Sequence, residues 1–162
     1  MTDLELAGKT ALVTGGTTAL GRACALALAD AGADVVLAYA RAKGAVPDLV
    51  REIQERGRRV IAVQADVSNS AEVSNLFLEA ESLGGVDILV NNAGPCVHRP
   101  LAELTDADWE DIVEPHLYGT FYCCREALPH MREQGWGRIL NLVYQPEDPE
   151  GRALGAYGIA RT

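Results

Sequence analysis

Five short apolar segments recur at regular intervals along the chain of 162 residues, and amphipathic segments separate them. Each apolar segment is rich in Val, Ile or Leu and lacks polar alternation, which is typical of strands covered on both faces. The alternation of strands and helices predicts right-handed crossovers and an α/β, doubly wound, Rossmann-like sheet, mostly parallel, between two helical layers. The length predicts a single domain over residues 1–162. The predicted strands are Thr10–Thr14, Asp34–Tyr39, Val60–Val63, Val86–Val90 and Arg138–Val143.

Apolar residues at helical spacing occupy the segments between these strands. The last predicted helix opens with Thr105-x-x-Asp108, which has the form of a capping box. It also contains Pro115, which should bend the helix or split it in two. The predicted helices run from Leu20 to Ala31, from Val46 to the residue before Gly57, from Asn69 to the residue before Gly84, and from Thr105 to near Gly135.

The formal net charge of −9 narrows the class of partner. Nucleic acids and anionic membranes bind proteins mainly through clustered Lys and Arg, so neither is expected here. No apolar run approaches the roughly 18 residues of a membrane-spanning helix. The first predicted strand begins close to Met1, which leaves no room for a signal peptide. We therefore expect a cytoplasmic protein.

The four cysteines predict neither a metal site nor a disulfide framework, because their spacing fits no metal-binding pattern and their density is low. Cys24, Cys123 and Cys124 fall in predicted helices, where we expect them to be small packing residues. Cys96 falls in a predicted loop, and its role stays open.

The first predicted strand leads into a glycine-rich turn and then a helix, Thr14-Gly15-Gly16-Thr17-Thr18-Ala19-Leu20-Gly21. Glycine lets main-chain N–H groups approach a pyrophosphate, and the helix N-terminus adds unpaired donors and partial positive charge. The stretch therefore predicts a phosphate-binding loop, with an ordinary turn at a helix entry as the alternative. The predicted contacts are Gly15, Thr17, Thr18, Ala19, Leu20 and Gly21.

This loop resembles the cofactor loop of the short-chain dehydrogenase/reductases, whose pattern is T-G-x-x-x-G-x-G. Ala19 stands where that pattern has its middle glycine, and the added methyl should crowd the cofactor and lower its affinity. Asn91-Asn92-Ala93-Gly94, after the fourth predicted strand, matches the family's N-N-A-G motif. The resemblance implies that the Asn side chains join neighbouring strand ends, while Ala93 and Gly94 leave room for the cofactor. An ordinary Asn/Gly turn is the alternative.

Two further strand ends bear on the choice of cofactor. Tyr39-Ala40-Arg41 follows the second strand, where a carboxylate would bind the ribose 2′-hydroxyl of NAD. No carboxylate is present and Arg41 can pair with a 2′-phosphate, so we expect NADP, with NAD as the second candidate. A solvated Arg41 is the alternative. Asp66-Val67 resembles the family's adenine-contacting position, and a turn or helix-capping role for Asp66 is equally consistent with the sequence.

The resemblance also implies hydride transfer between a nicotinamide and a carbonyl or alcohol, with Tyr, Lys, Ser and Asn around the substrate oxygen. Tyr157 matches the Tyr, but Arg161, Tyr144 and His116 replace the other three in that order. We therefore expect impaired catalysis. In the alternative, Tyr157 packs on the sheet, Arg161 is a surface cation, Tyr144 fills space above the sheet, and His116 is a hydrogen-bonded histidine at a helix bend.

General similarity to the branch of the family that reduces 3-oxoacyl thioesters implies a small carbonyl or alcohol substrate, in that branch an acyl thioester. The family's usual dimer surface is the long helix from Thr105, so a homo-oligomer is expected. Members of the family continue well past the Tyr motif, so the predicted fold is C-terminally incomplete relative to them. A non-catalytic dinucleotide-binding or regulatory module and a subunit that serves association remain as alternatives.

Overall fold

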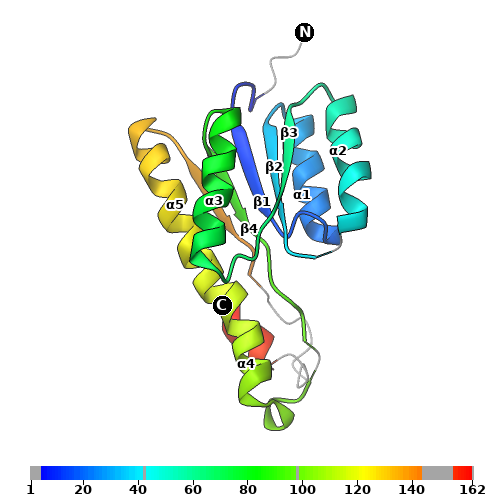
Figure 1. The fold of residues 1–162 in the computed structure, drawn as a ribbon, viewed down its shortest axis with the longest axis vertical. Coiled ribbons are helices and arrows are strands. Elements are labelled where there is room, and N and C mark those ends of the chain that lie inside the picture. The colour runs from blue at the N-terminus through cyan, green and yellow to red at the C-terminus, as the bar shows by residue number, and fades with distance from the viewer. Residues whose placement is uncertain (1–4, 42, 98, 144–154, 162) are drawn as a thin grey trace.

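The computed structural model describes residues 5–41, 43–97, 99–143 and 155–161. Strands and helices alternate along the chain, as the sequence predicts (Figure 1). The strands are β1 (Thr10–Thr14), β2 (Asp34–Tyr39), β3 (Val60–Gln64), β4 (Ile88–Asn91) and β5 (Arg138–Asn141). The helices are α1 (Ala19–Asp30), α2 (Val46–Glu55), α3 (Ser70–Ala80), α4 (Asp106–Val113), α5 (Gly119–Glu133) and α6 (Gly155–Ala160).

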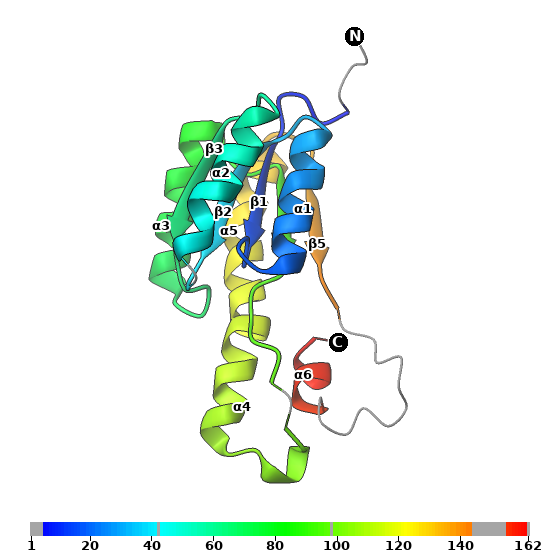
Figure 2. The same cartoon turned by 90° about the vertical axis from the view of Figure 1, so that its right-hand side faces the viewer.

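All strand pairs are parallel, in the order β3-β2-β1-β4-β5. Helices α1 and α2 lie on one face of the sheet, while α3 and α5 lie on the other (Figure 1). The predicted doubly wound architecture is therefore confirmed. Strand order reverses beside β1, between its neighbours β2 and β4, and in such a sheet ligands bind outside the carboxyl ends at this reversal. The α4 and α6 helices lie beyond that same end of the sheet (Figure 2).

The core consists of two apolar clusters, one on each face of the sheet. One cluster joins the sheet to α3 and α5, and its fully buried members include Leu76 and Leu89. The other joins the sheet to α1 and α2, and its fully buried members include Val35 and Ile53. Because both faces are buried, uninterrupted apolar strands are what this architecture requires.

The longest predicted helix forms with one change of geometry. Thr105 and Asp108 form the expected capping box at the start of α4. A π-helical segment, Glu114–Tyr118, contains Pro115 and connects α4 to α5, so the chain stays helical from Asp106 to Glu133. Pro115 is accommodated by this wider turn and does not split the helix. The Gly119 N–H donates to the carbonyl of Glu114, five residues earlier.

The cysteines in the helices are packing residues, as predicted. Cys123 is fully buried between α5 and the sheet, and burial raises the pKa of its thiol to about 12. Cys24 and Cys124 are half-buried beside the two clusters. Burial also raises the pKa of Cys124, and the hydrogen bond from Asn91 opposes this shift. At neutral pH both thiols of α5 stay protonated, which suits packing rather than redox chemistry.

None of the described helices combines the length and the apolar character that crossing a bilayer requires.

Candidate nucleotide-binding site

The glycine-rich loop between β1 and α1 is held by its own hydrogen bonds. Gly15 has a φ of 62°, in the left-handed region that favours glycine. The Gly16 N–H donates to the Ala38 carbonyl at 2.9 Å, which fixes the loop against β2. Thr18 caps α1, since its hydroxyl oxygen accepts from the Gly21 N–H at 3.1 Å.

The first turn of α1 supplies main-chain donors at this loop. The N–H groups of Ala19 and Leu20 belong to that turn, where the helix itself offers them no acceptor. Both residues are exposed, and Thr17 beside them is half-buried. The loop therefore offers N–H groups and the positive end of a helix dipole to an anion.

The predicted N-N-A-G segment is joined directly to the glycine-rich loop. Nδ2 of Asn92 lies 2.9 Å from the Thr14 carbonyl oxygen and 3.1 Å from both the Gly15 carbonyl oxygen and the Thr18 hydroxyl. The Thr14 hydroxyl oxygen accepts from the N–H groups of Asn92 and Ala93, at 2.9 and 3.1 Å. One buried amide and one buried hydroxyl thus set the position of the loop relative to β4.

Asn91 joins the next pair of strand ends. Its Nδ2 donates to Oδ1 of Asn141 at 2.8 Å, which connects the ends of β4 and β5. The same nitrogen lies 3.5 Å from the Cys124 sulfur on α5. The two Asn side chains therefore tie neighbouring strand ends, in agreement with the implied role.

Arg41 follows the end of β2 at Tyr39, and in the same strand the Ala38 carbonyl accepts from the Gly16 N–H of the glycine-rich loop. Its side chain is exposed, and among the described residues no carboxylate forms an ion pair with it. Tyr39 is buried in the sheet. A solvent-exposed guanidinium at this edge of the sheet can bind a phosphate through two parallel hydrogen bonds (bidentate binding).

Asp66 closes a turn after β3. Its carboxylate accepts from the Ser68 N–H at 3.0 Å and from the Ser68 hydroxyl at 2.6 Å, so the turn role of Asp66 is realised. The side chain is nevertheless exposed, and further acceptor capacity remains. Val67 is buried against Gly119, where a Cβ atom would lie 2.7 Å from a Val67 methyl carbon.

Arg161 is held by hydrogen bonds to other parts of the chain, unlike an arginine whose guanidinium is solvated at the surface. Its Nε donates to Nδ1 of His116 at 3.1 Å, and one Nη donates to the Leu142 carbonyl at 3.0 Å. The other Nη donates to the Asn92 carbonyl. All three guanidinium nitrogens are thus used in hydrogen bonds to other parts of the chain, so the surface-cation alternative is wrong.

His116 is buried in the π-helical segment, and both of its ring nitrogens have partners. Nε2 lies 3.0 Å from the Pro95 carbonyl oxygen, and Nδ1 faces Arg161. The structure therefore agrees with the alternative interpretation of His116, a hydrogen-bonded histidine at a helix bend. Tyr157 places its ring edge-on against the imidazole, with centroids 5.3 Å apart, and the Arg161 guanidinium carbon lies 5.4 Å from the Tyr157 ring centre.

Gly94 makes room for this arrangement. Its φ of 132° is unfavourable for other residues, and a Cβ atom there would lie 2.6 Å from Nε2 of His116 and still closer to other ring atoms. The structure thus brings Tyr157, Arg161 and His116 to the same sheet edge as Asn92 and the glycine-rich loop. Tyr144, the predicted counterpart of the family Ser, lies outside the described residues. Within the described ranges no group of three or more His, Cys, Asp or Glu residues could hold a metal ion.

Two contributors to this site escaped the sequence analysis. The hydroxyl of Thr14 holds the loop and the N-N-A-G segment together. Thr14 opens the glycine-rich stretch in the sequence, but its position there does not predict this role for its hydroxyl. The main-chain carbonyls of Leu142, Asn92 and Pro95 hold Arg161 and His116, and no residue identity can signal a carbonyl.

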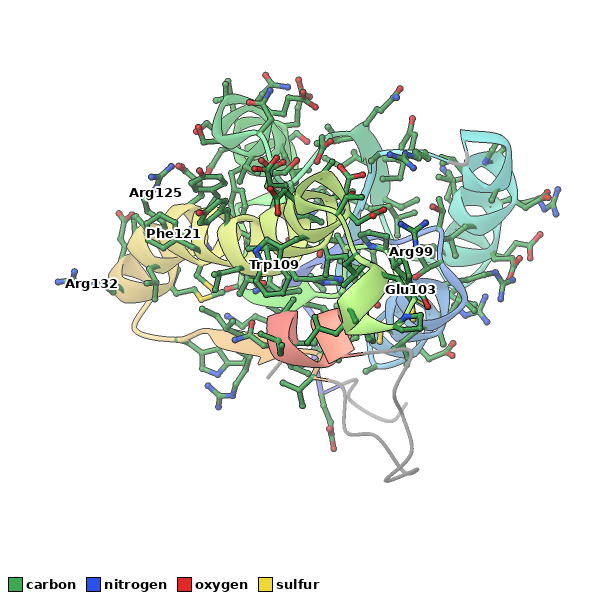
Figure 3. The ribbon with its side chains drawn as sticks, turned by 90° about the horizontal axis from the view of Figure 1, so that it is seen from below. Arg99, Glu103, Trp109, Phe121, Arg125 and Arg132 are labelled. Carbon is green, nitrogen blue, oxygen red and sulfur yellow. The ribbon has the colours of Figure 1, made fainter. Side chains whose placement is uncertain are left out.

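The outer face of α5 carries a second feature. Phe121 and Leu128 are exposed there, at 56% and 46%, although both are large and apolar. Figure 3 shows Phe121, Arg125 and Arg132 along this outer side of the helix. They border a shallow groove of about 710 Å³, lined by Phe121, Cys124, Arg125, Leu128, Pro129, Arg132 and Glu133.

Comparison with known proteins gives consistent matches over nearly the whole chain. The sequence profile of the short chain dehydrogenases matches residues 9–158. The 3-oxoacyl-[acyl-carrier-protein] reductase FabG of Staphylococcus epidermidis is 38% identical over 136 residues, which are 83% of this chain and 56% of the relative. A hydroxynaphthalene reductase-like protein of Metarhizium brunneum is 38% identical over 135 residues, 83% of this chain and 51% of the relative. The chain thus spans about half the length of these curated relatives.

Two solved structures share the fold closely. A putative short-chain alcohol dehydrogenase from Sinorhizobium meliloti superposes with a TM-score of 0.88 at 34% identity, covering 98% of this chain and 63% of the other. An NAD⁺-bound xylitol dehydrogenase gives a TM-score of 0.88 at 25% identity, covering 97% of this chain and 61% of the other.

Proposed function

Because the chain belongs to the short-chain dehydrogenase family, we propose that it is the nucleotide-binding part of an NAD(P)-dependent oxidoreductase that prefers NADP. The observation that carries this proposal is the junction of the glycine-rich loop with Asn92. There a helix N-terminus, a left-handed glycine and a buried amide meet at the point where strand order reverses.

The residues present fit a dinucleotide. Gly15 lets the loop pack closely on the N-N-A-G segment, since a Cβ atom there would lie 2.8 Å from Nδ2 of Asn92. The first-turn N–H groups of Ala19 and Leu20 would hold the pyrophosphate, and Asp66 with Val67 would border the adenine. When bound, the nicotinamide nucleotide supplies or accepts a hydride.

NADP is the preferred form because of the charge at the end of β2. Arg41 is exposed, follows the strand to which the loop is hydrogen-bonded, and has no carboxylate partner among the described residues. The 2′-phosphate of NADP would give the Arg41 guanidinium an anionic partner, whereas the 2′-hydroxyl of NAD would leave the guanidinium in solvent.

The reaction we propose is slow hydride transfer to or from a carbonyl or alcohol. Tyr157 is the proton donor candidate, at the edge of the site next to His116. Arg161 cannot serve as Lys does, because it stays protonated and its nitrogens already bind His116 and two carbonyls. The name of the FabG relative supports an acyl thioester as the substrate class.

A titration with nucleotides tests this function. We expect the chain to bind NADPH with a change in nucleotide fluorescence, and NADH more weakly. A chain whose role is association alone would bind neither, and that result would overturn the proposal. Binding of nucleotide without turnover would instead favour the non-catalytic dinucleotide-binding module, which the altered catalytic positions also support.

We further propose that the protein is a cytoplasmic homo-oligomer whose subunits meet through the outer face of α5. Exposed Phe121 and Leu128 beside the groove support this, because a monomer seldom leaves such residues together in solvent. Arg125 stacks against Phe121, with its guanidinium carbon 5.4 Å from the ring centre, and adds a polar rim to the patch.

A further inference from the structure

Arg161 joins three parts of the chain that are far apart in sequence. Its hydrogen bonds reach the carbonyl after β4, the carbonyl after β5, and the imidazole of His116 between α4 and α5. The two carbonyls accept at any pH of interest, since main-chain carbonyls do not titrate there. The imidazole is the partner whose ability to accept depends on pH.

The surroundings of His116 define its protonation state. The Pro95 carbonyl is an acceptor only, so the His116 nitrogen that faces it, Nε2, carries hydrogen. The guanidinium N–H of Arg161 is a donor only, so the other nitrogen, Nδ1, must present a lone pair. Both contacts are satisfied by the neutral imidazole with its hydrogen on Nε2. A proton on Nδ1 would set two N–H groups and two positive charges against each other.

We infer that His116 is a positioning residue for Arg161 that acts only as the neutral imidazole, so that protonation of His116 releases Arg161 and α6 from the carboxyl edge of the sheet. This inference goes beyond the proposed function, because it holds whether or not the chain binds a nucleotide. Its consequence for the site is that Tyr157, carried by α6, keeps its place only while His116 is uncharged.

The groups packed against the imidazole come from two elements besides its own. From α6 these are the Arg161 guanidinium and the Tyr157 ring. The segment after β4 contributes the main-chain groups of Ala93 and Pro95, which do not titrate. On the π-helical segment itself, Glu114 is exposed.

Together these surroundings lower the pKa of His116. Burial is the largest cause, the charge of Arg161 lowers the pKa further, and the hydrogen bonds to Pro95 and Ala93 oppose the shift. An unfolded histidine titrates near pH 6.5. The unfolded chain therefore takes up the proton first as the pH falls. The stabilisation by neutral His116 is complete above about pH 6.5 and is lost as the pH decreases from there towards the lowered pKa of the folded chain.

The imidazole itself gives the first test, on the unaltered chain. Nitrogen-15 NMR of the histidine rings should show His116 with hydrogen on Nε2 and a bare Nδ1 at pH 7.5, and a titration midpoint below 6.5. The spectrum of His116→Asn assigns the signal by its loss. A hydrogen on Nδ1, or a midpoint at or above 6.5, would overturn the inference.

The release of α6 gives the second test. The Arg161 main-chain N–H donates to the Tyr157 carbonyl at 3.1 Å, and its hydrogen exchange reports on the α6 end. Corrected for the intrinsic rate, its protection should fall about 10- to 100-fold between pH 7.5 and pH 5, the ratio for one hydrogen bond to a charged group.

Matched variants separate proton release from general destabilisation. His116→Asn keeps an acceptor that does not titrate, so its protection should be independent of pH. Arg161→Met should be poorly protected at every pH, and His130→Asn, which removes a histidine at the other end of α5, should keep the pH dependence of the unaltered chain. Constant protection in the unaltered chain, or an unchanged pH dependence in His116→Asn, would contradict the inference.

Discussion

Gly21 and Gly15 approach each other so closely that a Cβ atom on Gly21 would overlap the main-chain oxygen of Gly15. The same added atom would lie 2.8 Å from Nδ2 of Asn92, the amide that holds the loop to β4. Gly21 belongs to the first turns of α1, whereas Gly15 belongs to the loop after β1. The loop can therefore lie over the helix start only because residue 21 has no side chain.

Replacement of Gly21 by alanine should abolish nucleotide binding. The overlap is with backbone, which cannot rotate away, so the loop must shift relative to the first-turn N–H groups of α1. We expect Gly21→Ala to weaken NADPH binding at least about 100-fold, or ~2.7 kcal/mol. The control is Gly158→Ala, also in a helix, where an added Cβ atom meets no described residue within 4 Å. Calorimetric titration measures both, and a Gly21→Ala chain that binds as well as Gly158→Ala would contradict the structural argument.

NADPH should bind about 10- to 100-fold more tightly than NADH, because a charge-assisted contact to the 2′-phosphate contributes roughly 1.5–3 kcal/mol. Arg41→Ala should remove most of this difference. Arg51→Ala is the matched control, since Arg51 is an exposed arginine of α2 that pairs with Asp48. Equal affinities in the unaltered chain, or tighter binding of NADH, would count against the assignment of Arg41.

Association should depend on the outer face of α5. Sedimentation should show an oligomer at micromolar concentration, and Phe121→Glu with Leu128→Glu should dissociate it, because charges would be buried in the contact. Leu78→Glu is the control: Leu78 is a 69%-exposed leucine of the neighbouring α3. A monomer across the whole concentration range would rule out this surface as the interface. Dissociation by Leu78→Glu alone would move the interface to α3.

Carbonyl reduction should be slow, and a lysine at position 161 should restore little of it. We expect turnover of an acetoacetyl thioester below about 1 s⁻¹, the low end of the usual range for enzymes. The assay uses the chain joined to the C-terminal part of a full-length relative. Arg161→Lys removes the three hydrogen bonds of the guanidinium, and the lysine ammonium cannot reach all three of their acceptors.

Tyr144→Ser together with Arg161→Lys should restore more activity than Arg161→Lys alone. Loss of one hydrogen-bond donor to a developing oxyanion costs on the order of 10²–10³ in rate, and the tyrosine hydroxyl lies further from the backbone than the serine hydroxyl. Full recovery with Arg161→Lys alone, or turnover above about 1 s⁻¹ in the unaltered sequence, would falsify this prediction.

The strands were the most predictable part of the fold, because both of their faces are buried. Predicted and observed bounds agree at both ends for β1 and β2. β4 begins two residues after the predicted start at Val86. The intervening Asp87 is a buried carboxylate that accepts from the Thr10 N–H and from Lys9, at 3.0 and 3.1 Å. Apolar composition alone cannot place such a residue, since its partners lie on a distant strand.

Two prolines lie in helical segments that the low helix propensity of proline would not predict. Pro115 and Pro129 both lie within the helical stretch that ends at Glu133, although proline is strongly unfavourable inside a helix. Burial of Ile112, and of Cys123 and Ala127 in the core cluster that joins α5 to the sheet, outweighs that cost and keeps the helix continuous. Sequence periodicity predicted the helix, and the π-helical turn at Pro115 became visible only with the packing around it.

The candidate site was predictable as far as the family motifs extend. The contact between Asn92 and the glycine-rich loop was predictable, because one family motif contains Asn92 and the other contains the loop residues that it binds. The role of Arg161 in joining two strand ends was not predictable, since its partners are two main-chain oxygens and the side chain of His116. The hydrogen bonds of Arg161 depend on the positions of the carbonyls that follow β4 and β5, and those positions are set by tertiary packing.

The position of β1 in the sheet has a consequence for synthesis on the ribosome. Thr14 and Asn92 are in contact across 78 residues of sequence, so the glycine-rich loop leaves the exit tunnel long before the amide that fixes it. Until β4 is translated, β1 can pair only with β2. The loop is then not yet held in its final conformation, which costs conformational entropy to form. Parallel pairing over such separations is slow. The edge of β1 that pairs with β4 therefore has no partner strand until residues 88–91 have been translated.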